Sequence, residues 1–288
     1  MRKTAVIFLL IALVPFTAYA QQTDTQKIDA IFGRSGAMID DVYKFTFPRT
    51  DLKVGVDSLV LEPAAGLTSW VAFKTLGGGT SMATGDLVLL ESEVYPVTRT
   101  LIAEGIGITA IHNHLFGTTP NIMYLHFSGT GDAARIADSL RKALASTMTP
   151  LGAQPQAAAS TIDWAEVESI IGVKGQHTGN VDTITIPRAD TVTENGTILQ
   201  PAMGTGITLY FQMAGSKCAT TGDFVLIADE VNPVIKVLTD NNITVTALHN
   251  HMLREEPRLF YLHFWGFDDP GKVARALSFA LDRINAKR

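Results

Sequence analysis

The stretch Thr109-Ala110-Ile111-His112-Asn113-His114 occurs again 137 positions later as Thr246-Ala247-Leu248-His249-Asn250-His251. The match extends on both sides without a gap. The further corresponding segments are 85–89 with 222–226, 93–97 with 230–234, and 124–127 with 261–264. Self-similarity at one fixed offset is the mark of a duplicated structural unit. The chain is therefore predicted to contain two copies of one unit.

The copies are expected to span residues 27–148 and 163–288, with a linker at 149–162. The linker is rich in Ala, Pro, Gln and Ser, a composition typical of connecting segments. Upstream of the strongest match the correspondence needs a small gap, which aligns Arg49 with Arg188.

Residues 1–20 differ in character from the rest of the chain. Arg2 and Lys3 precede an apolar run that ends in Ala18-Tyr19-Ala20. This order of basic start, apolar run and small residues predicts a secretory signal peptide and a periplasmic or secreted protein. The competing interpretation is a membrane anchor, but the run is short for a bilayer span. After cleavage no stable membrane anchor is expected.

The composition excludes some classes of protein. A hydrophobic fraction of 46% and a charged fraction of 18% argue against a disordered chain. Loss of residues 1–20 removes two basic residues and no acidic one, which changes the formal net charge from −5 to −7. An acidic chain without a cluster of Lys and Arg is a poor candidate for binding nucleic acid.

The pattern of apolar residues predicts an α+β unit in each copy. In the first copy, residues 86–91, 106–114 and 124–128 have the apolar runs or alternation of strands, and further strands precede them, including 70–75. Residues 93–104 and 132–144 have helical spacing, and Pro96 is expected in the first helical turn. The expected fold is two helix-backed, mainly antiparallel sheets.

Six of the seven histidines lie in the repeated motif. They are His112, His114, His126, His249, His251 and His263. Residues two apart on a strand face the same side of a sheet, and an antiparallel neighbour can bring the third histidine beside them. Three imidazoles from adjacent strands suit a divalent transition metal, zinc above all, with one tripod expected per copy. A histidine hydrogen-bond network and an anion site remain alternatives.

Other residues near the motif have two possible roles each. Glu93 and Glu230 open the helix before the histidine strand and are candidates for a general base, a fourth ligand or a helix cap. Tyr124 and Tyr261 share the histidine face and are candidates to orient a substrate or a ligand. Trp265 has Ser128 as its counterpart in the first copy, which suggests that a second-copy site is more enclosed.

Several polar residues are expected to be structural. Asn113 and Asn250 point away from the histidine face and should fix the strand ends by hydrogen bonds. Asp86 and Asp223 are placed in a Thr-Gly-Asp turn. Arg49 and Arg188, each with an Asp two residues later, are expected to form internal ion pairs, with anion binding as the alternative.

The single cysteine, Cys218, has no partner for an internal disulfide. Its counterpart in the first copy is Ser81, which argues against a catalytic thiol. A small apolar core residue is the expected role.

The motif also resembles known families. The second copy, with His249-Asn250-His251 and Tyr261-Leu262-His263-Phe264-Trp265, resembles the LppY/LpqO family of exported bacterial proteins over essentially the whole mature chain. That resemblance implies a secreted two-copy protein without an assigned activity. The motif alone is also similar to acetolactate decarboxylase and the PPC domains, a resemblance that implies zinc held by His-x-His and a third histidine.

Two functions from different classes follow. The first is a metal-dependent hydrolase or lyase, which requires an open coordination position and a pocket above the histidines. The second is a non-catalytic periplasmic module that binds a metal ion or a small-molecule ligand.

Overall fold

The computed structural model describes residues 25–153 and 159–288. The predicted signal peptide at 1–20 and part of the predicted linker, 154–158, lie outside the described residues. Within those ranges, no helix is both long and apolar enough to cross a bilayer.

The first copy forms a six-stranded antiparallel sheet with the strand order β1-β2-β5-β6-β8-β7. Its long central strands pair over seven or more residues, so most of the backbone pairing lies in the middle of the sheet. The strands are β1 (Ala37–Ile39), β2 (Val42–Pro48), β5 (Thr68–Gly77), β6 (Thr80–Leu90), β7 (Gly107–His112) and β8 (Ile122–Gly131).

The second copy repeats this sheet with the order β15-β17-β14-β13-β10-β9. Its strands are β9 (Gln176–Thr178), β10 (Val181–Ile186), β13 (Ile207–Ala214), β14 (Lys217–Leu226), β15 (Thr244–His249) and β17 (Phe260–Asp268). Read from β9 to β15, this order matches that of the first sheet from β1 to β7, strand for strand. The duplication seen in the sequence is thus a duplication of structure, and the predicted α+β class is confirmed.

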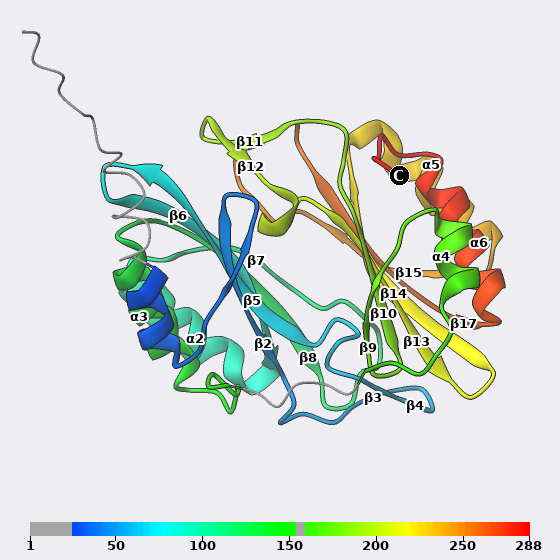
Figure 1. Cartoon of the computed structure of the whole chain (residues 1–288), viewed down its shortest axis with the longest axis horizontal. Coiled ribbons are helices and arrows are strands. Elements are labelled where there is room, and N and C mark those ends of the chain that lie inside the picture. Colours follow the sequence, from blue (N-terminus) through cyan, green and yellow to red (C-terminus); the bar gives the residue numbers. More distant parts are fainter. Residues whose placement is uncertain (1–24, 154–158) are drawn as a thin grey trace, which may run out of the picture.

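Helices cover one face of each sheet. Those of the first copy are α2 (Glu91–Ala103) and α3 (Ala133–Leu144), together with helical residues 25–32. Those of the second copy are α4 (Ala165–Ile171), α5 (Ala228–Asp240) and α6 (Pro270–Leu281). Figure 1 shows the two helical groups on opposite sides of the molecule, with the strands between them.

The alternation of residues along the strands decides which face meets which layer. In β8, Leu125 and Phe127 are buried in the core beneath α2 and α3. Tyr124, on the opposite face, is buried in a cluster that includes Val181 of the second copy. Since side chains alternate along a strand, the histidine faces of both sheets point to the middle of the molecule. The layers are therefore helix, sheet, sheet, helix.

Short arms interlock the two copies. The arm of β3 (Val54–Val56) and β4 (Leu59–Leu61) reaches across to Gln212, whose side chain accepts from Glu62 N at 2.9 Å and donates to Val60 O at 2.9 Å. The reciprocal arm of the second copy contains β11 (Val192–Glu194), β12 (Thr197–Leu199) and the 3-10 turn η1 (Pro201–Met203), and β16 (Glu255–Glu256) pairs with β11. Lys44 Nζ donates to Ala202 O of this arm at 2.9 Å.

The structure corrects one helix prediction. Helix α2 begins at Glu91, so Pro96 is its sixth residue and lies beyond the first turn. Pro233 occupies the same place in α5. A proline there removes one backbone hydrogen bond, and packing of both helices on their sheets compensates for that loss.

Candidate metal centre

The backbone places each histidine triplet at one end of its sheet. Strand β7 ends at His112 and lies antiparallel to β8, with His112 opposite Tyr124 and Ala110 opposite His126. His114 follows two residues after the strand end. The Asn113 side chain donates to Leu115 O at 3.2 Å, and Asn250 donates to Leu259 O at 2.5 Å. These bonds fix the strand ends, as predicted.

The two triplets meet in one cluster, which we call the joint histidine cluster: His112, His114, His126, His249, His251 and His263. Among the histidine rings, the closest contacts join different copies. Ring centroids lie 3.6 Å apart for His112 and His249, 3.7 Å for His114 and His263, and 3.6 Å for His126 and His251. Within the first copy, His112 lies 5.1 Å from His114 and 5.0 Å from His126. The structure thus brings the two histidine triplets, expected as separate tripods, together in one shared cluster, in which His112, His114 and His126 still form a possible ligand group.

The Nε2 atoms of the joint histidine cluster are its most informative feature. All six are shielded from solvent, and none has a hydrogen-bond partner among the residues that the structure describes. Three rings have Nδ1 next to a backbone carbonyl: His112 at 3.3 Å from Asn113 O, His249 at 3.4 Å from Asn250 O, and His263 at 3.0 Å from Gly222 O. Such contacts place the proton on Nδ1 and leave the Nε2 lone pair available to a ligand.

Two aspartates complete the cluster. Asp86 and Asp223 lie inside β6 and β14, directly opposite His126 and His263 on the neighbouring strands. Asp223 Oδ1 is 2.9 Å from His263 Nδ1, and Asp86 Oδ1 is 3.7 Å from His126 Nε2. The sequence prediction put both in a turn, which is wrong. The preceding glycines occur here because the backbone packs closely, since a Cβ on Gly85 would lie 2.5 Å from Trp70 O.

Burial dominates the electrostatics of the cluster. Burial first, and then neighbouring histidines, lower the pKa of His126 to about 3 and that of His249 to about 4. Burial, followed by the field of other histidines, also holds the pKa values of His112, His114 and His251 far below the ordinary value. These imidazoles are therefore neutral, the form that binds metal ions.

The pKa values of the two aspartates are shifted in opposite directions. Burial raises the pKa of Asp86 well above its ordinary value, and the nearby Asp223 raises it further. Burial also acts to raise the pKa of Asp223, but His263 and other histidines hold it below the ordinary value. Asp223 is therefore the ionised member of the pair.

Two tyrosine rings pack against histidine rings of the cluster. The Tyr124 ring stacks on His114 with centroids 3.3 Å apart, and the Tyr261 ring stacks on His251 at 3.5 Å. Their hydroxyls donate to Gly66 O at 3.2 Å and Gly204 O at 2.9 Å. Because these hydroxyls bond the copies' own arms, the tyrosines position the imidazoles.

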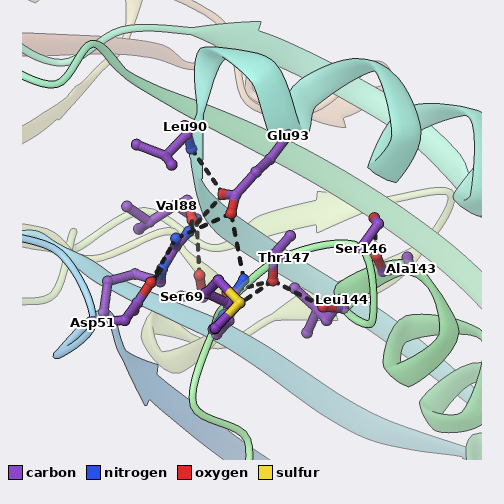
Figure 2. A network of polar contacts seen from close by, with 12 residues as sticks. Asp51, Ser69, Val88, Leu90, Glu93, Ala143, Leu144, Ser146 and Thr147 are labelled. Atoms are coloured by element: carbon purple, nitrogen blue, oxygen red, sulfur yellow. Dashed lines mark hydrogen bonds and ion pairs between the residues drawn. The ribbon is translucent and has the colours of Figure 1, made fainter.

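Glu93 and Glu230 lie in a different network. Glu93 accepts from Leu90 N at 2.9 Å (Figure 2). It also accepts from Arg49 at 2.9 Å, and the Arg49 side chain is fully buried. Glu230 makes the equivalent bonds to Ile227 N at 2.9 Å and to Arg188 at 2.6 Å. Each glutamate therefore caps its helix and pairs with an arginine. The predicted internal ion pairs also form, between Arg49 and Asp51 at 3.0 Å and between Arg188 and Asp190 at 2.5 Å. Neither contributes to the possible ligand groups of the described residues.

Three overlapping groups of the cluster could hold an ion. They are His112, His249, His251 and His263; His112, His114 and His126; and His114, Asp223 and His263. In each group the ligand atoms all lie within 4.8 Å of one another. A cavity of about 10 Å³ touches His126 and His251. This volume suits about one water molecule.

Comparison with known proteins gives the family. A family model with the description Domain of Unknown Function (DUF1259) matches the sequence twice, over residues 26–146 and 165–283. The chain belongs to this family. Each match covers one structural copy, so the family domain is the duplicated unit. A search of curated proteins found no match.

Two solved structures are similar to the chain at a low level. One is a trimeric bacterial microcompartment shell protein, PduB, with 12% identity and a TM-score of 0.22, covering 86% of this chain and 89% of that one. The other is a fused permuted hexameric shell protein from the RMM microcompartment, with 14% identity and a TM-score of 0.21, covering 72% and 85%. Scores this low do not indicate a shared overall fold.

Proposed function

We propose that this chain binds a divalent transition metal ion, zinc by preference, in a site that its two copies share. The observation that carries the proposal is the set of six buried Nε2 atoms without a hydrogen-bond partner. A buried polar atom left unpaired costs about 1–3 kcal/mol. Six such atoms in one place are costly unless they bind something, and a metal ion uses several of their lone pairs at once.

The four-histidine group is the preferred position for the ion. It draws His112 from the first copy and His249, His251 and His263 from the second. With Zn–N bonds of about 2.0–2.1 Å, two ligands of one ion are at most about 4.2 Å apart. The ligand atoms of this group lie within 4.8 Å of one another, so small side-chain shifts bring them to bonding distance. Imidazole donors suit zinc and its neighbours better than Mg²⁺ or Ca²⁺.

The geometry favours binding over turnover. A metal-dependent hydrolase or lyase needs space for a substrate beside the ion. The cavity at His126 and His251 has a volume of about 10 Å³, far less than a substrate requires. The two glutamates considered as general bases are committed to Arg49 and Arg188. We therefore favour a non-catalytic metal-binding module in which the ion ties the two sheets together.

The test is metal content by mass spectrometry on tag-free full chain. Two variants remove equivalent pairs of ligands: His112→Ala/His114→Ala in the first copy and His249→Ala/His251→Ala in the second. A shared site predicts that each variant loses the same whole equivalent of metal. Arg99→Met, on the exposed face of α2 and outside every possible ligand group of the described residues, is the control and retains that equivalent. A variant with all four replacements separates the cases: a shared site loses no more metal than each double variant does, whereas two independent sites, one per copy, lose a further equivalent. A wild-type chain that takes up no transition metal would refute the proposal.

We further propose that the chain works outside the cytoplasm, on the evidence of the signal-like residues 1–20 and the resemblance to exported LppY/LpqO proteins. Cell fractionation with mass measurement of the chain tests this. A periplasmic or secreted product that begins at Gln21 is the expected result. An uncleaved chain in the cytoplasm would contradict it.

A further inference from the structure

A second group of possible metal ligands lies in the second copy, away from the joint histidine cluster. Glu168 of α4, His177 of β9 and Asp182 of β10 bring ligand atoms within 4.8 Å of one another. His177 Nε2 is 2.9 Å from Glu168 Oε1 and 3.5 Å from Asp182 Oδ1. His177 and Asp182 are directly opposite each other in the hairpin of β9 and β10. Three donors of two kinds thus converge at the edge of the second sheet.

The first copy shows what this position looks like without those donors. At an offset of 139 residues, Glu168, His177 and Asp182 correspond to Asp29, Met38 and Tyr43. Met38 and Tyr43 are opposite each other in the same register. There the Tyr43 hydroxyl donates to Asp29 Oδ1 at 2.5 Å. Gly36 N also donates to Asp29 Oδ1 at 3.3 Å and to the Tyr43 hydroxyl at 3.0 Å. The first copy therefore closes the position with hydrogen bonds and has no imidazole there.

Asp182 is the unusual residue of the second copy. Its side chain is fully buried, and among the described residues neither carboxylate oxygen accepts a well-formed hydrogen bond. Gly175 makes room for it, because a Cβ at Gly175 would lie 1.8 Å from Asp182 Oδ1. A buried carboxylate without a donor is costly. Where the first copy has Tyr43, the second copy therefore has a carboxylate, Asp182, whose Oδ1 lies 3.5 Å from the imidazole of His177.

We propose that Glu168, His177 and Asp182 form a second site for a divalent transition metal, specific to the second copy. One imidazole and two carboxylates are a donor set used for zinc and similar ions. The His177 side chain is 36% exposed, so an ion can enter from solvent and keep water on its open positions. The position shares no residue with the joint histidine cluster, so it does not depend on the function proposed for that cluster.

The alternative is an ion pair in which protonated His177 bridges both carboxylates without a metal. The two arrangements differ in their response to added ion. In the ion pair, His177 Nε2 carries a proton and has no lone pair for zinc. In the metal site, the same nitrogen is a ligand.

The experiment titrates Zn²⁺, and Co²⁺ as its spectroscopic substitute, into metal-free full chain and counts bound equivalents. The variant His177→Met/Asp182→Tyr gives the second copy the residues of the first, which are compatible with this hairpin. His177→Gln removes one partly exposed ligand and leaves the core unchanged. Both variants should bind one equivalent fewer than the wild-type chain, and the Co²⁺ absorption of this site should disappear.

The two metal proposals can fail separately. His249→Ala/His251→Ala, which disables the joint histidine cluster, should still bind one Zn²⁺ through Glu168, His177 and Asp182. Equal stoichiometry for the wild-type chain, His177→Gln and His177→Met/Asp182→Tyr would overturn the second site, whatever the cluster binds. Folding of each variant is checked by circular dichroism before titration.

Discussion

At the scale of single residues, Asp223 Oδ1 lies 2.9 Å from His263 Nδ1, and its counterpart Asp86 lies 3.7 Å from His126 Nε2. The sequence shows both after Thr-Gly, a pair common in turns, and the turn prediction followed. The structure places them in strands opposite the third histidine of each copy. A signal against a turn was present, because each aspartate is the first residue of an apolar run that is typical of a buried strand, 86–91 in the first copy. Which strand lies beside that run is a long-range property that local pattern does not contain.

Cys218 gives the first prediction. Burial raises the pKa of this thiol to about 12, and the residue lies in the core of the second copy. Since thiolate is the reactive form, roughly one molecule in ten thousand is reactive at pH 8. Iodoacetamide should label the folded chain very slowly. It should label a chain unfolded in guanidinium at the normal rate of a free thiol. Rapid stoichiometric labelling of folded protein would contradict the burial.

Arg49 gives the second prediction. Its side chain is fully buried and pairs with Asp51 at 3.0 Å and Glu93 at 2.9 Å. Arg49→Met leaves the Glu93 carboxylate without its partner, which should cost about 3–5 kcal/mol in the free energy of unfolding. Urea denaturation followed by circular dichroism measures this. Arg99→Met, on the exposed face of α2, is the control and should change the value by no more than about 0.5 kcal/mol. A loss below 1 kcal/mol at Arg49 would mean that the ion pair is unimportant.

At the scale of elements, the close approach of strands around β6 is testable. Gly85 pairs with Val71 and Phe127 on the two neighbouring strands. A Cβ there would lie 2.4 Å from the Phe127 ring, so Gly85→Ala forces β6 and β8 apart. Overpacking of this kind costs about 1–3 kcal/mol. The matched control is Gly55→Ala in β3, where the added Cβ would meet Thr119 O at 3.7 Å, an ordinary contact. Thermal unfolding of both variants compares them, and equal melting temperatures would show that β6 adapts.

At the same scale, helices α2 and α5 show how tertiary packing overrides local preference. Both contain a proline in their interior, at Pro96 and Pro233. Buried residues such as Val97 and Leu101 hold α2 on its sheet. A glutamate side chain bonds the backbone before each helix start. Because the interior proline and the glutamate cap occur in both copies, they belong to the duplicated unit.

At the scale of the whole molecule, metal should stabilise the fold because its ligands come from both copies. An ion that binds only the native state at 1,000 times its Kd adds about 4 kcal/mol. For a chain of this size that raises Tm by on the order of 10 °C. Differential scanning fluorimetry with and without Zn²⁺ measures the rise, and Mg²⁺, which prefers oxygen ligands, is the control ion. His249→Ala/His251→Ala should lose most of the effect. An equal rise for this variant and the wild-type chain would place the stabilising ion elsewhere.

Residue patterns alone were enough to predict the duplication, the α+β class, and the helices at 93–104 and 132–144 to within a few residues, and they singled out the six histidines. These are local or periodic properties, and a repeat at one offset makes them visible twice. The sequence also predicted a helix cap as one role of Glu93, because a carboxylate favours a helix start, and an internal ion pair for Arg49, because Asp51 follows it by two residues. The helices at 25–32 and 165–171 were not predicted.

Only the tertiary structure decided that the two triplets form one cluster. Each copy taken alone presents three histidines on one sheet face, and the sequence pattern is the same whether that face meets solvent, a ligand or the other copy. The interlocking arms and the apolar residues around the histidines turn both faces inward. Burial of those faces against each other stabilises one arrangement, and contacts between segments far apart in the chain, such as His112 with His249, arise only then.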